Sequence, residues 1–145
     1  MAAHEPRINH PNFLNHIDDL KPIIDNVASD SAALDSTIEL LVQSGRSLPM
    51  AKILTIPEAW AHRRDFSKKL KDLYAYANAV MEPWDGPAAI CGFHNDWAIA
   101  GMDRNGLRPL RYTLTDKFLI AGSETGMVDI DETDIIERGR VGPGQ

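Results

Sequence analysis

Both faces of the strand-like segments between residues 87 and 122 are apolar. In AAICGF, Ala88 and Ile90 point one way and Ala89, Cys91 and Phe93 point the other, because successive side chains of a strand alternate. WAIAGM and FLIA repeat this pattern. An antiparallel sheet with one face in water should instead alternate apolar and polar residues. We therefore expect a sheet covered on both faces, an antiparallel meander with strands at about 87–93, 97–103, 108–115 and 117–122.

The part of the chain before this region has a helical period. SDSAALDSTIELLVQSG predicts a helix with one apolar stripe, and FSKKLKDLYAYANAVM predicts another that ends before Pro83. Shorter helical pieces are expected near 11–20 and 49–53. Helices followed by strands favour an α+β fold or a layered sandwich over alternating βαβ units. The helices can cover one sheet face. Because residues 123–145 are short and polar, we expect a partner or a missing segment to cover the other.

Composition excludes several classes of protein. The net charge of −6, with acidic residues spread along the chain, argues against nucleic-acid binding, which needs a basic face. No apolar run reaches 18 residues, so we expect no membrane span, and MAAHEPRINHPNF lacks the apolar core of a signal peptide. A single cysteine rules out an internal disulfide framework. We expect one cytoplasmic domain.

No metal site is predicted. Cys91 and His94 form a C-x-x-H pair, but at odd spacing on a strand they point to opposite faces, and no second ligand pair has zinc spacing. We expect Cys91 to be a buried structural cysteine. The acidic set around residues 129–134 lacks the glycine and closing glutamate of a calcium loop, and GRVGPG lacks the lysine of a phosphate loop.

The most crowded stretch of the chain is DRNGLRPLRY, residues 103–112. Asn105-Gly106 predicts the tight turn of a hairpin, since both residues accept positive φ, and Pro109 fits an edge or bulged position. We interpret its charges as structural. The side chains of Arg104, Arg108 and Arg111 are expected to pin the turn through carboxylates such as Glu124 or Asp103.

Asp30 is the one candidate for ligand binding. It stands where a helix begins, so it is a candidate helix cap or first-turn acid. The helix N-terminus also keeps such a carboxylate ionised. An ionised carboxylate is what an α-ammonium group needs, although the pattern alone does not select that role.

Several segments together resemble one family, the glutamine amidotransferase domain of the glutamate synthase large subunit. They are SDSAALD, SGRSLPMAK, IPEAW, MEPWDGPAAI, DRNGLRPLRY, GSETG and GRVGPGQ, in the family's order and spacing. MEPWDGPA with DRNGLRP is highly specific, whereas D-x-x-G-x-R-P-L followed by S-E is common to class II glutamine amidotransferases. The resemblance covers residues 12–145, as a partial type 2 domain that follows an irregular segment over 1–11.

The resemblance implies an α+β fold, the N-terminal-nucleophile hydrolase α-β-β-α sandwich, with one sheet layer incomplete here. In the family an N-terminal cysteine attacks the glutamine amide with its own α-amino group as base, and an Asn-Gly pair forms the oxyanion hole. The ammonia joins 2-oxoglutarate and is reduced to glutamate, in domains that carry FMN and an iron-sulfur cluster. By this resemblance Asp30 binds the α-amino group of glutamine, and Glu124 and the arginines of DRNGLRPLRY are structural.

The sequence departs from the family pattern at the nucleophile. It begins MAAHEP, and an alanine exposed by loss of Met1 cannot attack an amide. Cys91 lies within a strand and has no free amino group. The family's arginine for the glutamine carboxylate and its Asn-Gly pair belong upstream of residue 12. We therefore expect the C-terminal portion of a glutaminase domain, with no catalytic residue or cofactor of its own and no activity alone.

Two alternatives stay open. Another chain can supply the missing N-terminal half, which would make this one chain of a split amidotransferase. Otherwise the chain is a non-catalytic glutamine-binding or interaction module that keeps Asp30.

Overall fold

Helices precede strands in the fold. The computed structural model describes residues 11–13, 16–25 and 27–145, so the predicted irregular segment falls, apart from Pro11, outside the described residues. Three helices come first: α1 (Asp30–Gln43), α2 (Leu48–Thr55) and α3 (Lys68–Val80). The strands that follow are β1 (Ala89–His94), β2 (Trp97–Met102), β3 (Arg111–Thr115), β4 (Leu119–Gly122) and β5 (Ile135–Arg140). No helix among the described residues is long and apolar enough to cross a membrane.

Local sequence signals set the ends of the helices. The Ser29 hydroxyl accepts a hydrogen bond from the Ala32 amide at 3.3 Å, and Ser67 caps α3 in the same way. Gly45, at φ 95°, follows the end of α1 as a left-handed cap. The helix predicted near 11–20 is wrong. Two 3-10 turns, Pro11–Phe13 and Asp18–Leu20, stand there, because so short a segment with so little burial cannot sustain an α-helix.

The strands form two sheets instead of one meander. β1 and β2 form an antiparallel hairpin from Ala89↔Met102 to His94↔Trp97, and Asn95, at φ 49°, makes the predicted turn. The second sheet has the antiparallel order β4-β3-β5. β2 and β3 do not pair, so the predicted hairpin at Asn105-Gly106 is wrong. β5 was not predicted because IIERGR carries no clean alternation.

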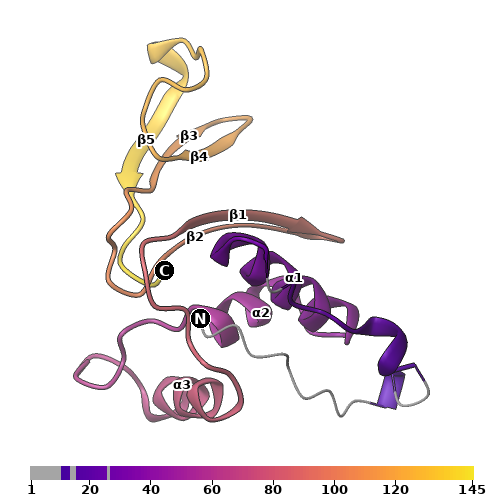
Figure 1. Ribbon diagram of the computed structural model, residues 1–145. Coiled ribbons are helices and arrows are strands. Elements are labelled where there is room, and N and C mark those ends of the chain that lie inside the picture. Colours follow the sequence, from indigo (N-terminus) through magenta and orange to yellow (C-terminus); the bar gives the residue numbers. More distant parts are fainter. Residues whose placement is uncertain (1–10, 14–15, 26) are drawn as a thin grey trace.

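Figure 1 shows how these elements are layered: the β1–β2 hairpin lies over α1 and α2, and the three-stranded sheet projects away from the helices. Two apolar clusters form the core beneath the hairpin. One joins Leu34, Ile56, Trp84 and Ala88, and the other joins Val42, Leu48 and Ala51. Ile90 and Ile99 pack onto these clusters from the hairpin. The prediction that helices cover one face of the strands is thus confirmed for the hairpin.

The other face of the hairpin is open. Phe93 is 78% exposed and Cys91 is exposed as well. The prediction of a buried Cys91 is therefore wrong, because no described residue forms a second layer over this face. Large exposed apolar surfaces of this kind mark places where a partner or a further segment packs.

Candidate functional site

Asp30 is the first residue of α1, and its carboxylate is unengaged. Ser29 performs the capping, so Asp30 is a first-turn acid and not the cap. Its side chain is exposed and has no hydrogen bond or ion pair within the described part of the chain. The positive end of the helix dipole favours a negative charge at this position. The carboxylate is thus exposed and available to a cationic group.

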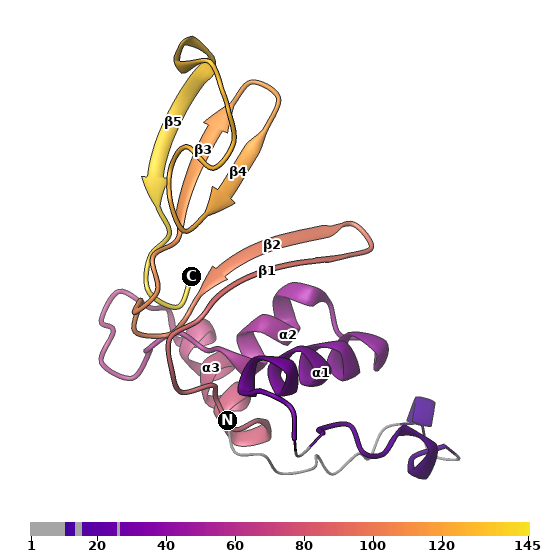
Figure 2. The same cartoon turned by 45° about the horizontal axis from the view of Figure 1, so that its top comes forward.

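The core places Asp30 near the start of β1. Leu34 follows one helical turn later on the same side of α1, where it packs with Trp84 and Ala88. Ala88 immediately precedes β1, and Figure 2 shows this part of the hairpin lying over the helices. Asp30 consequently lies at the N-terminal end of α1, near the end of the hairpin that is farthest from its turn.

Asp103, directly after β2, organises the loop that follows. Its side chain is 1% exposed, and its carboxylate accepts hydrogen bonds from backbone N–H groups at 3.0–3.2 Å. The donors are the amides of Ala88, Asn105, Leu107 and Arg108. Burial, the largest effect, would raise the pKa of Asp103, but the backbone donors together outweigh it and lower that pKa. A buried carboxylate held only by main-chain amides is a structural anchor.

This geometry corrects the interpretation of the arginines. Asp103 binds the backbone amide of Arg108 and not its guanidinium, and no ion pair of Arg104, Arg108 or Arg111 occurs among the described residues. Glu124 lines a hollow beside β3 together with Arg111, but no ion pair joins them. The predicted pinning through guanidinium groups is therefore wrong, although the loop is structural as expected.

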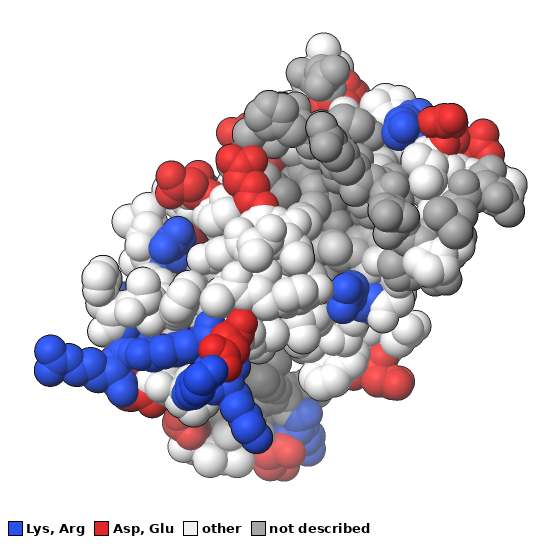
Figure 3. Space-filling model, turned by 90° about the horizontal axis from the view of Figure 1, so that it is seen from below, with Lys and Arg blue, Asp and Glu red and all other residues white. Residues whose placement is uncertain are grey.

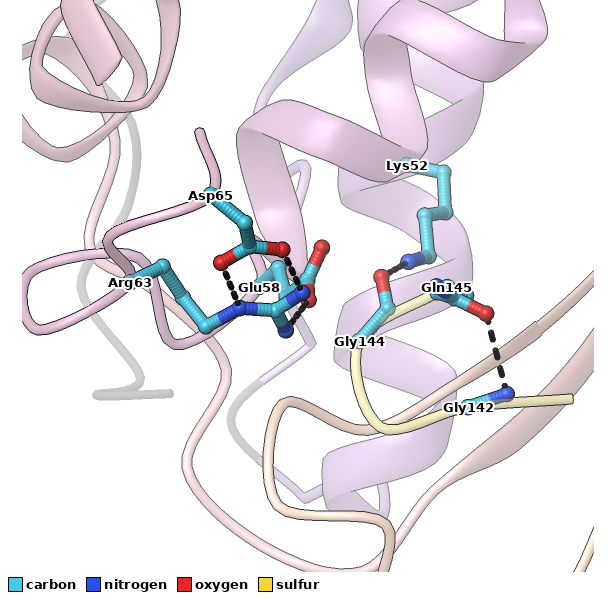
Figure 4. A network of polar contacts seen from close by, with 7 residues as sticks. All are labelled: Lys52, Glu58, Arg63, Asp65, Gly142, Gly144 and Gln145. Atoms are coloured by element: carbon cyan, nitrogen blue, oxygen red, sulfur yellow. Dashed lines mark hydrogen bonds and ion pairs between the residues drawn. The ribbon is translucent and has the colours of Figure 1, made fainter. Parts of the chain in front are cut away.

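Two sets of polar contacts lie beside α2, one between α2 and residues 142–145 and the other within the loop that follows α2 (Figure 4). Lys52 is 8% exposed, and its Nζ donates a hydrogen bond to the Gly144 carbonyl. Glu58 is 7% exposed and pairs with Arg63 at 2.7 Å, while Arg63 also pairs with Asp65 at 2.6 Å. The hydrogen bond from Arg63, the largest effect, helps to lower the pKa of Asp65 to about 2. The Lys52 bond thus joins α2 to the C-terminal residues, whereas Glu58, Arg63 and Asp65 are joined within the loop between α2 and α3.

Basic side chains gather around the start of α3. The stretch RRDFSKKLK carries two arginines and three lysines, and Figure 3 shows Lys and Arg side chains together at one side of the face seen from below. Arg63 and Lys68 are paired with carboxylates, whereas exposed Arg64 and Lys69 have no ion pair in the described ranges. This is a local cationic surface on a chain whose net charge is −6.

No group of three or more His, Cys, Asp and Glu side chains that could hold a metal ion occurs among the described residues. Cys91 is exposed and stands at odd spacing from the half-buried His94 on β1.

Comparison with known protein families shows which family this chain belongs to. Residues 1–145 match the family described as glutamine amidotransferases class-II. The chain belongs to the class-II glutamine amidotransferase family. This confirms the resemblance carried by MEPWDGPA and DRNGLRP.

Individual relatives of this amidotransferase domain are glutamate synthases. The chain is 52% identical over 146 residues to the glutamate synthase [NADPH] large chain of Azospirillum brasilense, covering all of this chain and 10% of that protein. It is 44% identical to the glutamate synthase [NADH] of Schizosaccharomyces pombe, with 7% of that protein covered. It is 41% identical to the ferredoxin-dependent glutamate synthase 2 of Synechocystis sp., with 10% covered. The chain thus spans about a tenth of the length of the relatives it matches.

Sequence reasoning did not predict the burial of Asp103 and Lys52 in this amidotransferase domain. A signal existed for Asp103: an aspartate two residues before Asn-Gly commonly bonds the amides that follow it. Lys52 stands one helical turn after Leu48 and one before Ile56, both buried, so its position predicted burial. Neither signal revealed that Lys52 meets Gly144, because 92 positions separate them.

Proposed function

We propose that this chain is the glutamine-holding part of a glutamate synthase amidotransferase domain, and that Asp30 binds the α-ammonium group of glutamine. One observation carries the proposal: the Asp30 carboxylate is exposed and unpaired while Ser29 caps the helix. A carboxylate with no structural task at a helix N-terminus remains free for a cationic ligand. The family and its glutamate synthase relatives support glutamine as that ligand.

The nucleophile of the reaction is proposed to come from polypeptide outside the described residues. Cys91 lies within β1, where its backbone is part of the ladder with Ala100, so it cannot use its own α-amino group as a base. We propose that the cysteine-bearing segment packs on the open face of the hairpin, around Phe93, and completes an N-terminal-nucleophile hydrolase sandwich. The 145-residue chain alone is then inactive as a glutaminase.

The downstream chemistry is proposed to follow the family. Glutamine hydrolysis would release ammonia, and the remainder of a glutamate synthase would join it to 2-oxoglutarate and reduce the product to glutamate. The FMN and iron-sulfur cluster of that step belong to other domains. The relatives named above differ in electron donor, so we assign no donor to this chain.

A glutamine titration followed by amide NMR tests the role of Asp30. We expect glutamine to shift the amides of Ser29 and Ser31 in the wild-type chain. Asp30→Asn should weaken the apparent affinity tenfold or more, since a hydrogen bond to a charged group contributes about 1.5–3 kcal/mol. Asp35→Asn, at another exposed acid of the same helix, should leave the affinity unchanged.

Two results would contradict the proposal. Equal affinities of Asp30→Asn and wild type, or no response to glutamine at millimolar concentrations, would remove Asp30 from the binding site. Glutaminase activity of the purified chain, measured as ammonia release, would refute the proposal that the nucleophile comes from outside it. Glutamine binding without hydrolysis is the expected outcome.

A further inference from the structure

The last residues of the chain are held against the end of the hairpin by a set of main-chain hydrogen bonds. We call residues 141–145 the latch. Each of these bonds joins the latch to residues at or after the end of β2. They are Met102 N–H to Gln145 O at 2.9 Å, Gly144 N–H to Asp103 O at 2.8 Å and Val141 N–H to Leu110 O at 3.0 Å.

Lys52 holds the latch from the side of α2. Its Nζ donates to the Gly144 carbonyl (Figure 4). The stem of Lys52 reaches this position past Gly101, where a Cβ atom would stand only 2.9 Å from Lys52 Cε. The lysine is buried because the latch and the hairpin close over it, so it regains water when the latch leaves.

The closed position of the latch requires glycine at position 144. Gly144 has φ 73°, which side chains rarely adopt, and a Cβ there would lie 2.6 Å from Glu58 Cα. Gly126 has a similar φ of 83°, but nothing lies within 4 Å of its Cβ position. Comparing Gly144→Ala with Gly126→Ala therefore separates the effect of backbone strain from the effect of a steric clash between the latch and Glu58.

We propose that residues 141–145 open and close as a unit over Lys52, and that the charge of this one amine sets how often they open. Three main-chain hydrogen bonds and the Lys52 bond hold the latch, so its local opening breaks few interactions and needs less free energy than global unfolding. Closure takes the Lys52 amine out of water, and opening returns it. The latch and the amine are therefore linked, with Gly144 as their point of contact.

The ionisable surroundings favour this linkage. Burial lowers the pKa of Lys52 to about 8, and the carboxylate of Glu58 opposes that shift. Arg63 pairs with Glu58 and so weakens the opposition, and Tyr74 on α3 interacts with the same carboxylate. On the hairpin side stands Asp103, whose carboxylate accepts hydrogen bonds from backbone amides.

The sign of the pH dependence follows from these values. The closed state has the lower Lys52 pKa, about 8, against an ordinary value of 10.5 when the amine is solvated. Between these values the open state binds more protons, so opening becomes rarer as pH rises. From pH 7 to pH 9 the open population should fall about tenfold.

A lysine titration by NMR gives the first test. In wild type we expect the Cε resonance of Lys52 to titrate near pH 8, well below the ordinary lysine value of 10.5. Gly144→Ala should move the midpoint toward 10.5, whereas Gly126→Ala should leave it near 8. A Lys52 midpoint near 10.5 in wild type, or an unchanged midpoint in Gly144→Ala with its circular dichroism intact, would overturn the proposal.

Amide exchange supplies a second test that does not depend on Gly144→Ala folding. The protection factors of Met102 and Gly144 should rise about tenfold from pH 7 to pH 9 in wild type. They should be independent of pH in Lys52→Met, while Lys69→Met behaves as wild type. Two results would refute the proposal. The first is the same pH dependence in Lys52→Met as in wild type. The second is exchange of the latch amides at the rate of interior α1 amides, because the segment would then open only when the whole fold unfolds.

Discussion

Replacing Asp103 by asparagine should destabilise the chain by about 3 kcal/mol at pH 7. The change keeps the size of the side chain, but it turns one acceptor oxygen into an NH₂ donor that faces backbone N–H groups. The amide of Ala88 is buried, so its lost bond to a charged group costs about 1.5–3 kcal/mol. The amides of Leu107 and Arg108 belong to exposed residues, so water replaces most of what they lose.

Urea unfolding followed by the fluorescence of Trp60, Trp84 and Trp97 measures this loss. With an m-value of about 1–3 kcal/mol per molar urea, the midpoint of Asp103→Asn should fall by about 1–3 M. Asp116→Asn is the control, because Asp116 is exposed and has no hydrogen bond in the described part of the chain. Its midpoint should stay within about 0.3 M of wild type.

The pH dependence sharpens the prediction. Because the folded pKa of Asp103 is lowered, its contribution is complete above the ordinary value of about 3.9 and is lost as pH falls through the folded value. The difference between wild type and Asp103→Asn should therefore be constant from pH 5 to 7 and shrink below pH 4. A midpoint equal to that of Asp116→Asn at pH 7 would refute the role of Asp103 as the anchor of the loop.

Two further substitutions test the sheets. Gly139→Ala should cost about 1–3 kcal/mol of stability in the same urea assay, because its Cβ would lie 2.5 Å from the ring of Tyr112 on the paired strand. Gly92→Ala is the control, because the nearest atom to its Cβ position is 3.5 Å away. An equal loss of stability in both variants would contradict this packing. Phe93→Ser should change stability by less than about 0.5 kcal/mol, since Phe93 is 78% exposed, and should reduce self-association in light scattering. A loss typical of a core residue would mean that the open hairpin face is covered in solution.

Periodicity and local chemistry determined the helices. Ser29, Gly45 and Ser67 mark helix ends because caps depend on the residues beside them. The doubly apolar pattern of AAICGF also predicted the open face that holds Phe93, because the faces of a strand alternate whatever lies around it. The position of Asp30 at the start of α1 followed from the same local signals.

Tertiary structure decided what distant residues do to one another. Asn105-Gly106 has the residue types of a hairpin turn, but the Asp103 carboxylate accepts hydrogen bonds from the amides of this loop. β3 then pairs with β4 and β5 and not with β2. The latch needs Lys52 and Gly144, which lie 92 positions apart, to meet in one buried place. Contacts of this kind depend on chain topology and burial, and local sequence carries neither.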